Sequence, residues 1–188
     1  MKKLLGIVVL GLLLSGNAYA ELITLTKCYI EKYVHLDKTS HTSKIVNGVV
    51  KRTPEPSTTT TTYRFNNFEE HYSHPEFNHQ ENLLYTLDTV TEIITRTIIN
   101  SDSYIENFLK KGVVVDKYSK DQYRINDLGG NVASAEILNK RKNIVVDKID
   151  VDFVSNKVFA TLKMSFKLQD GESSSMSLSK IYKCKRQK

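Results

Sequence analysis

Hydrophobic and polar residues alternate with a period of two along much of the chain. The clearest run is "VFATLKMSFKL", in which one side is apolar and the other carries lysine, serine and threonine. The apolar positions are Val158, Ala160, Leu162, Met164, Phe166 and Leu168. Such alternation is typical of a strand with one face on a core and the other in water. It predicts a long strand over 158–168.

The two ends of the chain show the same alternation. The apolar side of the final segment holds Met176, Leu178, Tyr182 and Cys184. The intervening "QDGESS" is rich in turn-forming residues, so the last two runs predict an antiparallel hairpin. Near the start, one side of a further predicted strand is formed by Leu22, Thr24, Thr26, Cys28, Ile30 and Val34.

Residues 1–20 have the three parts of a cleaved signal peptide. Lys2 and Lys3 precede the apolar run 4–14, and Ala18-Tyr19-Ala20 has the small-x-small pattern of a cleavage site. The apolar run is shorter than the roughly 20 residues that span a bilayer as a helix. The sequence predicts cleavage near Ala20-Glu21 and a periplasmic or secreted product without a transmembrane helix. Residues 21–188 suit a single β-rich domain.

Export bears on the two cysteines, Cys28 and Cys184. In an oxidising compartment paired thiols form disulfides, and two cysteines allow one intramolecular bond. Two buried free thiols, or a bond to another chain, are the alternatives. An intramolecular bond requires the first and last strands to lie side by side. Such a pairing closes a meander and removes both of its exposed edges.

These observations favour a mainly β fold. We expect an antiparallel meander that forms a small barrel or a strongly curved sheet, with the first and last strands adjacent. A sandwich whose end strands are neighbours fits the same cysteines. A long loop is expected at about 38–62, because Pro54 and Pro56 exclude a central strand and the threonine run offers no core residues.

One segment, "SDSYIENFLKKG", predicts a helix. Ser103 and Glu106 have capping-box spacing, and Gly112 suits the position after a helix end. The apolar stripe consists of Tyr104, Ile105, Phe108 and Leu109. We expect one short helix near 103–111 that packs on the sheet or plugs it.

The strongest metal candidate is the segment "EEHYSHPEFNH", which holds His71, His74 and His79. Imidazole and carboxylate ligands suit zinc or copper. However, the spacing matches no specific motif, and the residue before Pro75 favours an extended conformation that does not align three ligands on a helix. We expect a solvated polar loop and no bound metal or other cofactor.

No pattern for catalysis or nucleic-acid binding is present. The chain has no Gly-x-Ser-x-Gly elbow and no phosphate-binding glycine loop. We therefore expect no enzyme. Of the formal net charge of +6, two charges belong to Lys2 and Lys3. The basic residues at 140–142 and 180–188 lack the interleaved aromatics of a nucleic-acid surface. They are expected to be solvated faces that protect strand edges.

Three classes of function remain. We expect an exported, soluble, non-catalytic β-domain that binds a small apolar or amphipathic ligand. A structural or protein-interaction component of the bacterial cell envelope is the alternative. A small outer-membrane barrel is weaker, because Trp is absent and the final residues are polar. The pattern does not separate a cavity from a filled interior, and it identifies neither ligand nor partner.

Overall fold

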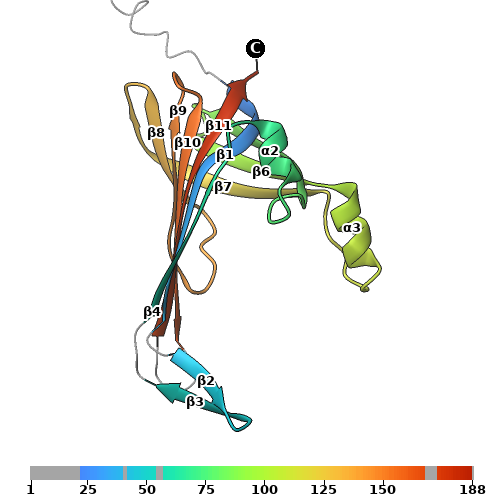
Figure 1. The fold of residues 1–188 in the computed structure, drawn as a ribbon. Coiled ribbons are helices and arrows are strands. Elements are labelled where there is room, and N and C mark those ends of the chain that lie inside the picture. Colours follow the sequence, from blue (N-terminus) through green and yellow to red (C-terminus); the bar gives the residue numbers. More distant parts are fainter. Residues whose placement is uncertain (1–21, 40–41, 54–56, 168–172, 188) are drawn as a thin grey trace, which may run out of the picture.

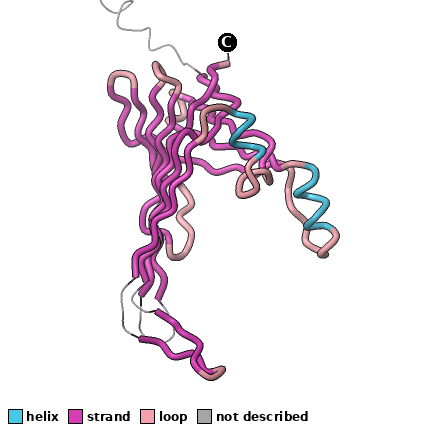
Figure 2. Tube along the Cα trace, in the orientation of Figure 1, coloured by secondary structure: helices cyan, strands magenta, loops and turns pink. Residues whose placement is uncertain are grey.

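Strands dominate the computed structural model, which describes residues 22–39, 42–53, 57–167 and 173–187 (Figure 2). The predicted signal peptide at 1–20 and most of the turn between the last two strands lie outside these residues. The elements are β1 (Leu22–Thr39), β2 (Thr42–Val46), β3 (Val49–Thr53), β4 (Ser57–Arg64), α2 (Phe68–Ser73), β5 (Gln80–Asp88), β6 (Ile93–Asn100), α3 (Asp102–Leu109), β7 (Tyr118–Gly129), β8 (Val132–Ile137), β9 (Ile144–Asp152), β10 (Lys157–Lys167) and β11 (Ser173–Arg186).

The sheet closes into an eight-stranded antiparallel barrel, which confirms the predicted fold. Strands β5 to β11 form a meander, and β1 pairs with β5 through its first residues and with β11 along most of its length. The order is therefore β1-β5-β6-β7-β8-β9-β10-β11 and back to β1. An additional strand, β4, pairs with the second half of β1. The first and last strands are neighbours, as expected.

A disulfide joins these two strands. Cys28 and Cys184 have an S–S distance of 2.08 Å and lie 156 residues apart in the sequence. The predicted intramolecular bond is thus confirmed. In the chain-entropy model, a cross-link of this span stabilises the folded state by up to about 5 kcal/mol.

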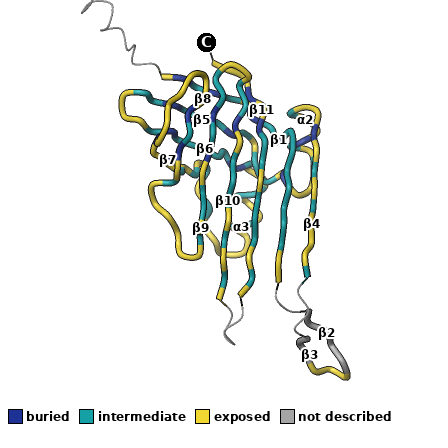
Figure 3. Tube along the Cα trace, turned by 90° about the vertical axis from the view of Figure 1, so that its left-hand side faces the viewer, coloured by how far each residue is buried: buried dark blue, intermediate teal, exposed yellow. Residues whose placement is uncertain are grey.

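Alternation along the strands builds a filled core in one half of the barrel. On β11, for example, Tyr182 and Cys184 are buried while Lys183 and Lys185 are exposed. Figure 3 shows the buried residues gathered in the half of the molecule nearest the C-terminus. Each fully buried large apolar side chain contributes roughly 1.5–3 kcal/mol. The largest fully buried side chains of this core include Leu25, Tyr85, Ile94, Tyr123, Ile149 and Val158.

Beyond the barrel, β1, β4, β10 and β11 continue as an extended sheet, with the β2–β3 hairpin past its end (Figure 1). The long loop that we predicted at about 38–62 is therefore wrong, since most of this segment is strand. Its threonines form β4 because threonine has a high β propensity and β1 offers a free edge. The expectation that these residues provide no core holds, as Thr58, Thr59 and Thr60 are exposed.

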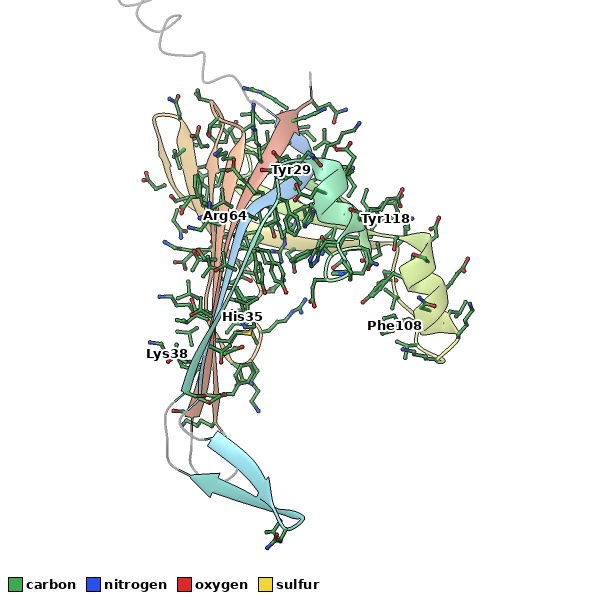
Figure 4. The ribbon with its side chains drawn as sticks, viewed as in Figure 1. Tyr29, His35, Lys38, Arg64, Phe108 and Tyr118 are labelled. Atoms are coloured by element: carbon green, nitrogen blue, oxygen red, sulfur yellow. A yellow bond between two sulfur atoms is a disulfide. The ribbon has the colours of Figure 1, made fainter. Side chains whose placement is uncertain are left out.

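The predicted helix is present as α3, but it starts earlier and lies elsewhere than expected. Its N-cap is Ser101, whose side chain accepts a hydrogen bond from the Tyr104 amide at 3.4 Å. No residue of α3 is buried, and the helix projects away from the barrel rather than packing on or plugging it (Figure 1). Figure 4 shows Phe108 far from the sheet.

A second helix, α2, was not predicted. Asn67 caps it by accepting a hydrogen bond from the Glu70 amide at 2.8 Å. The Tyr72 hydroxyl donates to the Cys28 carbonyl at 2.8 Å, which fixes α2 against β1 beside the disulfide. The helix thus covers the point where the partner of β1 changes from β5 to β4.

Candidate ligand-binding site at the open end of the barrel

The barrel interior changes from apolar to charged towards the end that lies away from the buried core. Arg96 on β6 lies between Tyr85 on β5 and Asp121 on β7 in the sheet register. Because β6 alternates, Arg96 shares the inward face with the buried Ile94 two residues earlier. The charged groups therefore lie inside the barrel, immediately next to the apolar core.

Arg96 is held in place by an ion pair and an aromatic ring. Its Nη2 and Nε atoms donate to Asp121 Oδ2 at 2.8 and 3.3 Å. Its guanidinium lies 5.6 Å from the centre of the Tyr123 ring. The side chains of Arg96 and Asp121 are only 23% and 15% exposed. A pair this shielded and doubly bonded is geometrically fixed.

Two further ionisable side chains reach this end of the barrel, Asp147 on β9 and Lys180 on β11. Asp147 pairs with Leu162 in the register, and Lys180 pairs with Ala160. Burial raises the pKa of the Asp147 carboxyl, and the nearby Arg96 charge opposes this shift only in part. Lys180 lies 5.4 Å from the centre of the Tyr33 ring and has no acidic partner among the described residues. Its ammonium is available to an anion.

A pocket of about 340 Å³ opens next to these charges. A smaller void of about 50 Å³ shares Arg96, Asp147 and Leu162 with it and extends to Lys180. The volume falls in the range of small-molecule sites, which begins at about 300 Å³. The apolar part of the pocket wall consists of Ile98, Ile137, Ile144, Leu162 and Met164. Its polar rim consists of Ser119, Asn139, Arg141 and Lys142.

The apolar wall continues onto the extended sheet. Met164 pairs with Met176, and Leu162 pairs with Leu178, across β10 and β11. Phe166 follows on the same face of β10, because every second residue of a strand points to one side. All of these side chains are half-buried. Figure 4 shows the two faces of the extension, with His35 and Lys38 on opposite sides. The concave apolar face consists of Leu162, Met164, Phe166, Met176 and Leu178.

Together, the charges and the wall suit a molecule with an anionic head and an apolar body. The pocket and its small extension are lined by four cationic side chains and two acidic ones. The acidic side chains are Asp121, which binds Arg96, and Asp147. The positive excess favours an anion, and the methionines adapt to apolar groups of varied shape.

The predicted metal candidates do not converge. His71 is buried among aromatic rings, with ring centres 5.1 Å from Phe65, 4.4 Å from Tyr72 and 4.9 Å from Phe77. His74 packs on Tyr63, and His79 packs on Tyr104 of α3. Within the described residues there is no group of three metal-ligating side chains that could hold an ion.

The solvated loop that we predicted around these histidines is wrong for His71, which is 0% exposed. Neither of its ring nitrogens has a hydrogen-bond partner in the described part of the chain. Burial lowers the pKa of His71 to about 4, and the positive charges of Lys180, His79 and His74 add to the effect. This histidine is a neutral part of the packing between α2 and the sheet.

The charged residues of the candidate site were not identified from the sequence. Arg96 occupies a position in the run "EIITRTIIN" where alternation predicts an inward side chain. An arginine at an inward position of a strand is rarely buried without a partner, so this position could have indicated the charged site. Lys180 was predicted to be solvated together with the other terminal lysines, and this prediction is wrong because it shares the inward face with Tyr182.

No protein-family model and no curated protein sequence matches the chain. Among solved structures, the fold is similar to a mutant of transferrin binding protein B (TbpB), a vaccine antigen from Haemophilus parasuis, with a TM-score of 0.38 and 5% sequence identity. The similarity covers 90% of this chain and 27% of the TbpB chain. A similarity this distant carries no argument about function. Among the described residues, no helix has the length and apolar character to cross a membrane.

Proposed function

We propose that the protein is a non-catalytic binding protein for a small amphipathic molecule with an anionic head group. The head group binds at the open end of the barrel near Lys180 and Arg96, and the apolar body lies on the concave apolar face. The observation that carries this proposal is the continuity of a charged floor with a half-exposed apolar wall around one pocket of about 340 Å³. The filled core excludes the other half of the barrel as the binding place.

Lys180 is the main contact for the head group in this proposal. The guanidinium of Arg96 already binds Asp121, whereas Lys180 lines the void and has no acidic partner among the described residues. Arg96 then helps to position the head group and attracts its negative charge from a distance. The protein acts outside the cytoplasm, which the formed disulfide and the predicted signal peptide support.

The test is a titration of the protein with laurate, a twelve-carbon carboxylate, in which isothermal titration calorimetry measures the binding. Lys180→Gln removes the ammonium and is expected to weaken laurate binding by about 10- to 100-fold, since a hydrogen bond to a charged group is worth roughly 1.5–3 kcal/mol. Dodecanol, which has the same chain and no charge, is expected to bind both proteins equally.

Lys163→Gln is the matched control. Lys163 lies next to Leu162 on the same strand but on the exposed outer face, so this substitution should leave laurate affinity unchanged. An equal loss in both variants would indicate a general effect of surface charge and would contradict the proposal. The absence of laurate and dodecanol binding to the unmodified protein would contradict it as well.

A further inference from the structure

A second pocket, of about 370 Å³, lies on the outer side of the barrel wall beside the disulfide. It is separate from the open end of the barrel and shares no lining residue with that site. The side chains that matter for its chemistry are Lys27, Lys183, Lys185, Tyr29, Phe68 and Glu69. They come from β1, β11 and the start of α2.

The strand register brings the three lysines together. On β11, Lys183 and Lys185 point outward because Tyr182 and Cys184 point into the barrel. Across the seam, Tyr29 pairs with Lys183 and Thr26 pairs with Lys185. An irregularity in β1 between Thr26 and Tyr29 inserts Lys27 at this point. Three lysine residues therefore line one hollow at the seam of the barrel.

The backbone at Lys27 has an unusual conformation for a residue other than glycine. Its φ is +50°, in the left-handed region that non-glycine residues rarely adopt. Such conformations are energetically costly for residues other than glycine and are found preferentially at functional sites. The disulfide at the next residue, Cys28, holds the segment in place. Lys27 is thus fixed at the pocket despite the local cost.

These lysines have no acidic partner among the described residues, whereas Lys117 and Lys157 each have one. Lys157, for comparison, lies 2.7 Å from Glu31 on the same outer wall. The pocket lining contains one carboxylate, that of Glu69. Three cations and one anion leave an excess of two positive charges, which matches the charge of a phosphate monoester. Lysine binds phosphate as a point charge.

The remaining wall is ordered and aromatic. The Tyr29 hydroxyl donates to the Asn66 carbonyl at 3.0 Å (Figure 4 labels Tyr29). The Phe68 ring packs on Tyr72 with their centres 4.3 Å apart. These contacts fix both rings before any ligand arrives, so little side-chain freedom is lost on binding.

We propose that this pocket is a binding site for a phosphoryl group of the monoester type. The group belongs either to a small phosphorylated molecule or to a phospholipid head group, and the two sources share the same recognition by Lys27, Lys183 and Lys185. Tyr29 and Phe68 contact the part of the ligand next to the phosphate. The site does not depend on the function proposed for the open end of the barrel.

The test uses the full mature chain and two probes. The first probe is glycerol 3-phosphate, whose binding is measured by calorimetry. Glycerol, which lacks the phosphate, is the uncharged comparison. The second is co-sedimentation with phosphatidylcholine vesicles that contain phosphatidic acid, whose head group is a phosphate monoester. The double variant Lys27→Gln, Lys183→Gln is expected to bind at least 10-fold more weakly than the unmodified protein to whichever of the two probes the unmodified protein binds.

The control carries Lys120→Gln and Lys148→Gln, which remove two charges from exposed positions on β7 and β9. This variant is expected to bind like the unmodified protein. Binding of glycerol 3-phosphate assigns the site to a soluble ligand, and binding of vesicles alone assigns it to a lipid head group. The proposal is overturned if neither probe binds, or if both double variants lose the same affinity.

Discussion

At the scale of single residues, the structure contains buried polar groups with few partners. The hydroxyls of Tyr85 and Tyr123 and both ring nitrogens of His71 are buried without hydrogen bonds to the described residues. The tyrosines lie at the border between the apolar core and the charged end of the barrel. His71 lies instead between α2 and the sheet, where edge-to-face contacts with Phe65 and Tyr72 surround it.

The burial of His71 predicts a specific dependence of stability on pH. Its pKa falls from 6.5 to about 4 on folding, so between these values the unfolded chain binds a proton that the folded chain does not. The free energy of unfolding therefore decreases as the pH falls through this window, by about 3 kcal/mol in total at 1.36 kcal/mol per pKa unit. Urea unfolding at pH 7.5, 5.5 and 4.5 measures this effect.

His71→Leu provides the comparison, because leucine has a similar volume and does not titrate. This variant is expected to lose less stability than the unmodified protein over the same pH range. Other histidines titrate in both proteins and cancel in the difference. Parallel pH curves for the two proteins would show that His71 is protonated equally in the folded and unfolded chains, against the prediction.

At the scale of elements, alternation identified β1, β10 and β11, which have a buried or half-buried face, and gave no signal for β4, which lacks one. β10 and β11 alternate clearly, and both were predicted. β4 consists mainly of exposed threonines, so the hydrophobic pattern carried no signal and its pairing with β1 decided its structure. The helix α2 is only six residues long, and its single signal was the spacing of Asn67 and Glu70.

β4 is expected to be less protected than the barrel strands. It pairs with one neighbour, β1, and the side chains of Thr58, Thr60 and Thr62 are exposed. Local opening of such an edge costs less free energy than opening of the core. Hydrogen exchange followed by mass spectrometry should show faster deuteration over 57–64 than over β5, which pairs on both edges. Equal protection of the two strands would contradict this assignment.

At the scale of the whole molecule, the two cysteines predicted the closure of the sheet, and the shape beyond the barrel was not predictable. The seam between β1 and β11 follows from a disulfide in an antiparallel meander. The extended sheet arises because β1, β10 and β11 continue past the end of the barrel and pair there with one another and with β4. The candidate site depends on this excess length and on charges that β6, β7 and β9 place together only after folding.

The most direct test of the proposed binding function uses the methionines as probes. The chain has three methionines, Met1, Met164 and Met176, and the latter two form a cross-strand pair on the concave apolar face. In the mature protein labelled with ¹³C at the methionine methyl groups, NMR titration with laurate is predicted to shift both signals to saturation, and the shifts should require higher laurate concentrations in Lys180→Gln. Unchanged Met164 and Met176 signals at saturating laurate would contradict the proposed function.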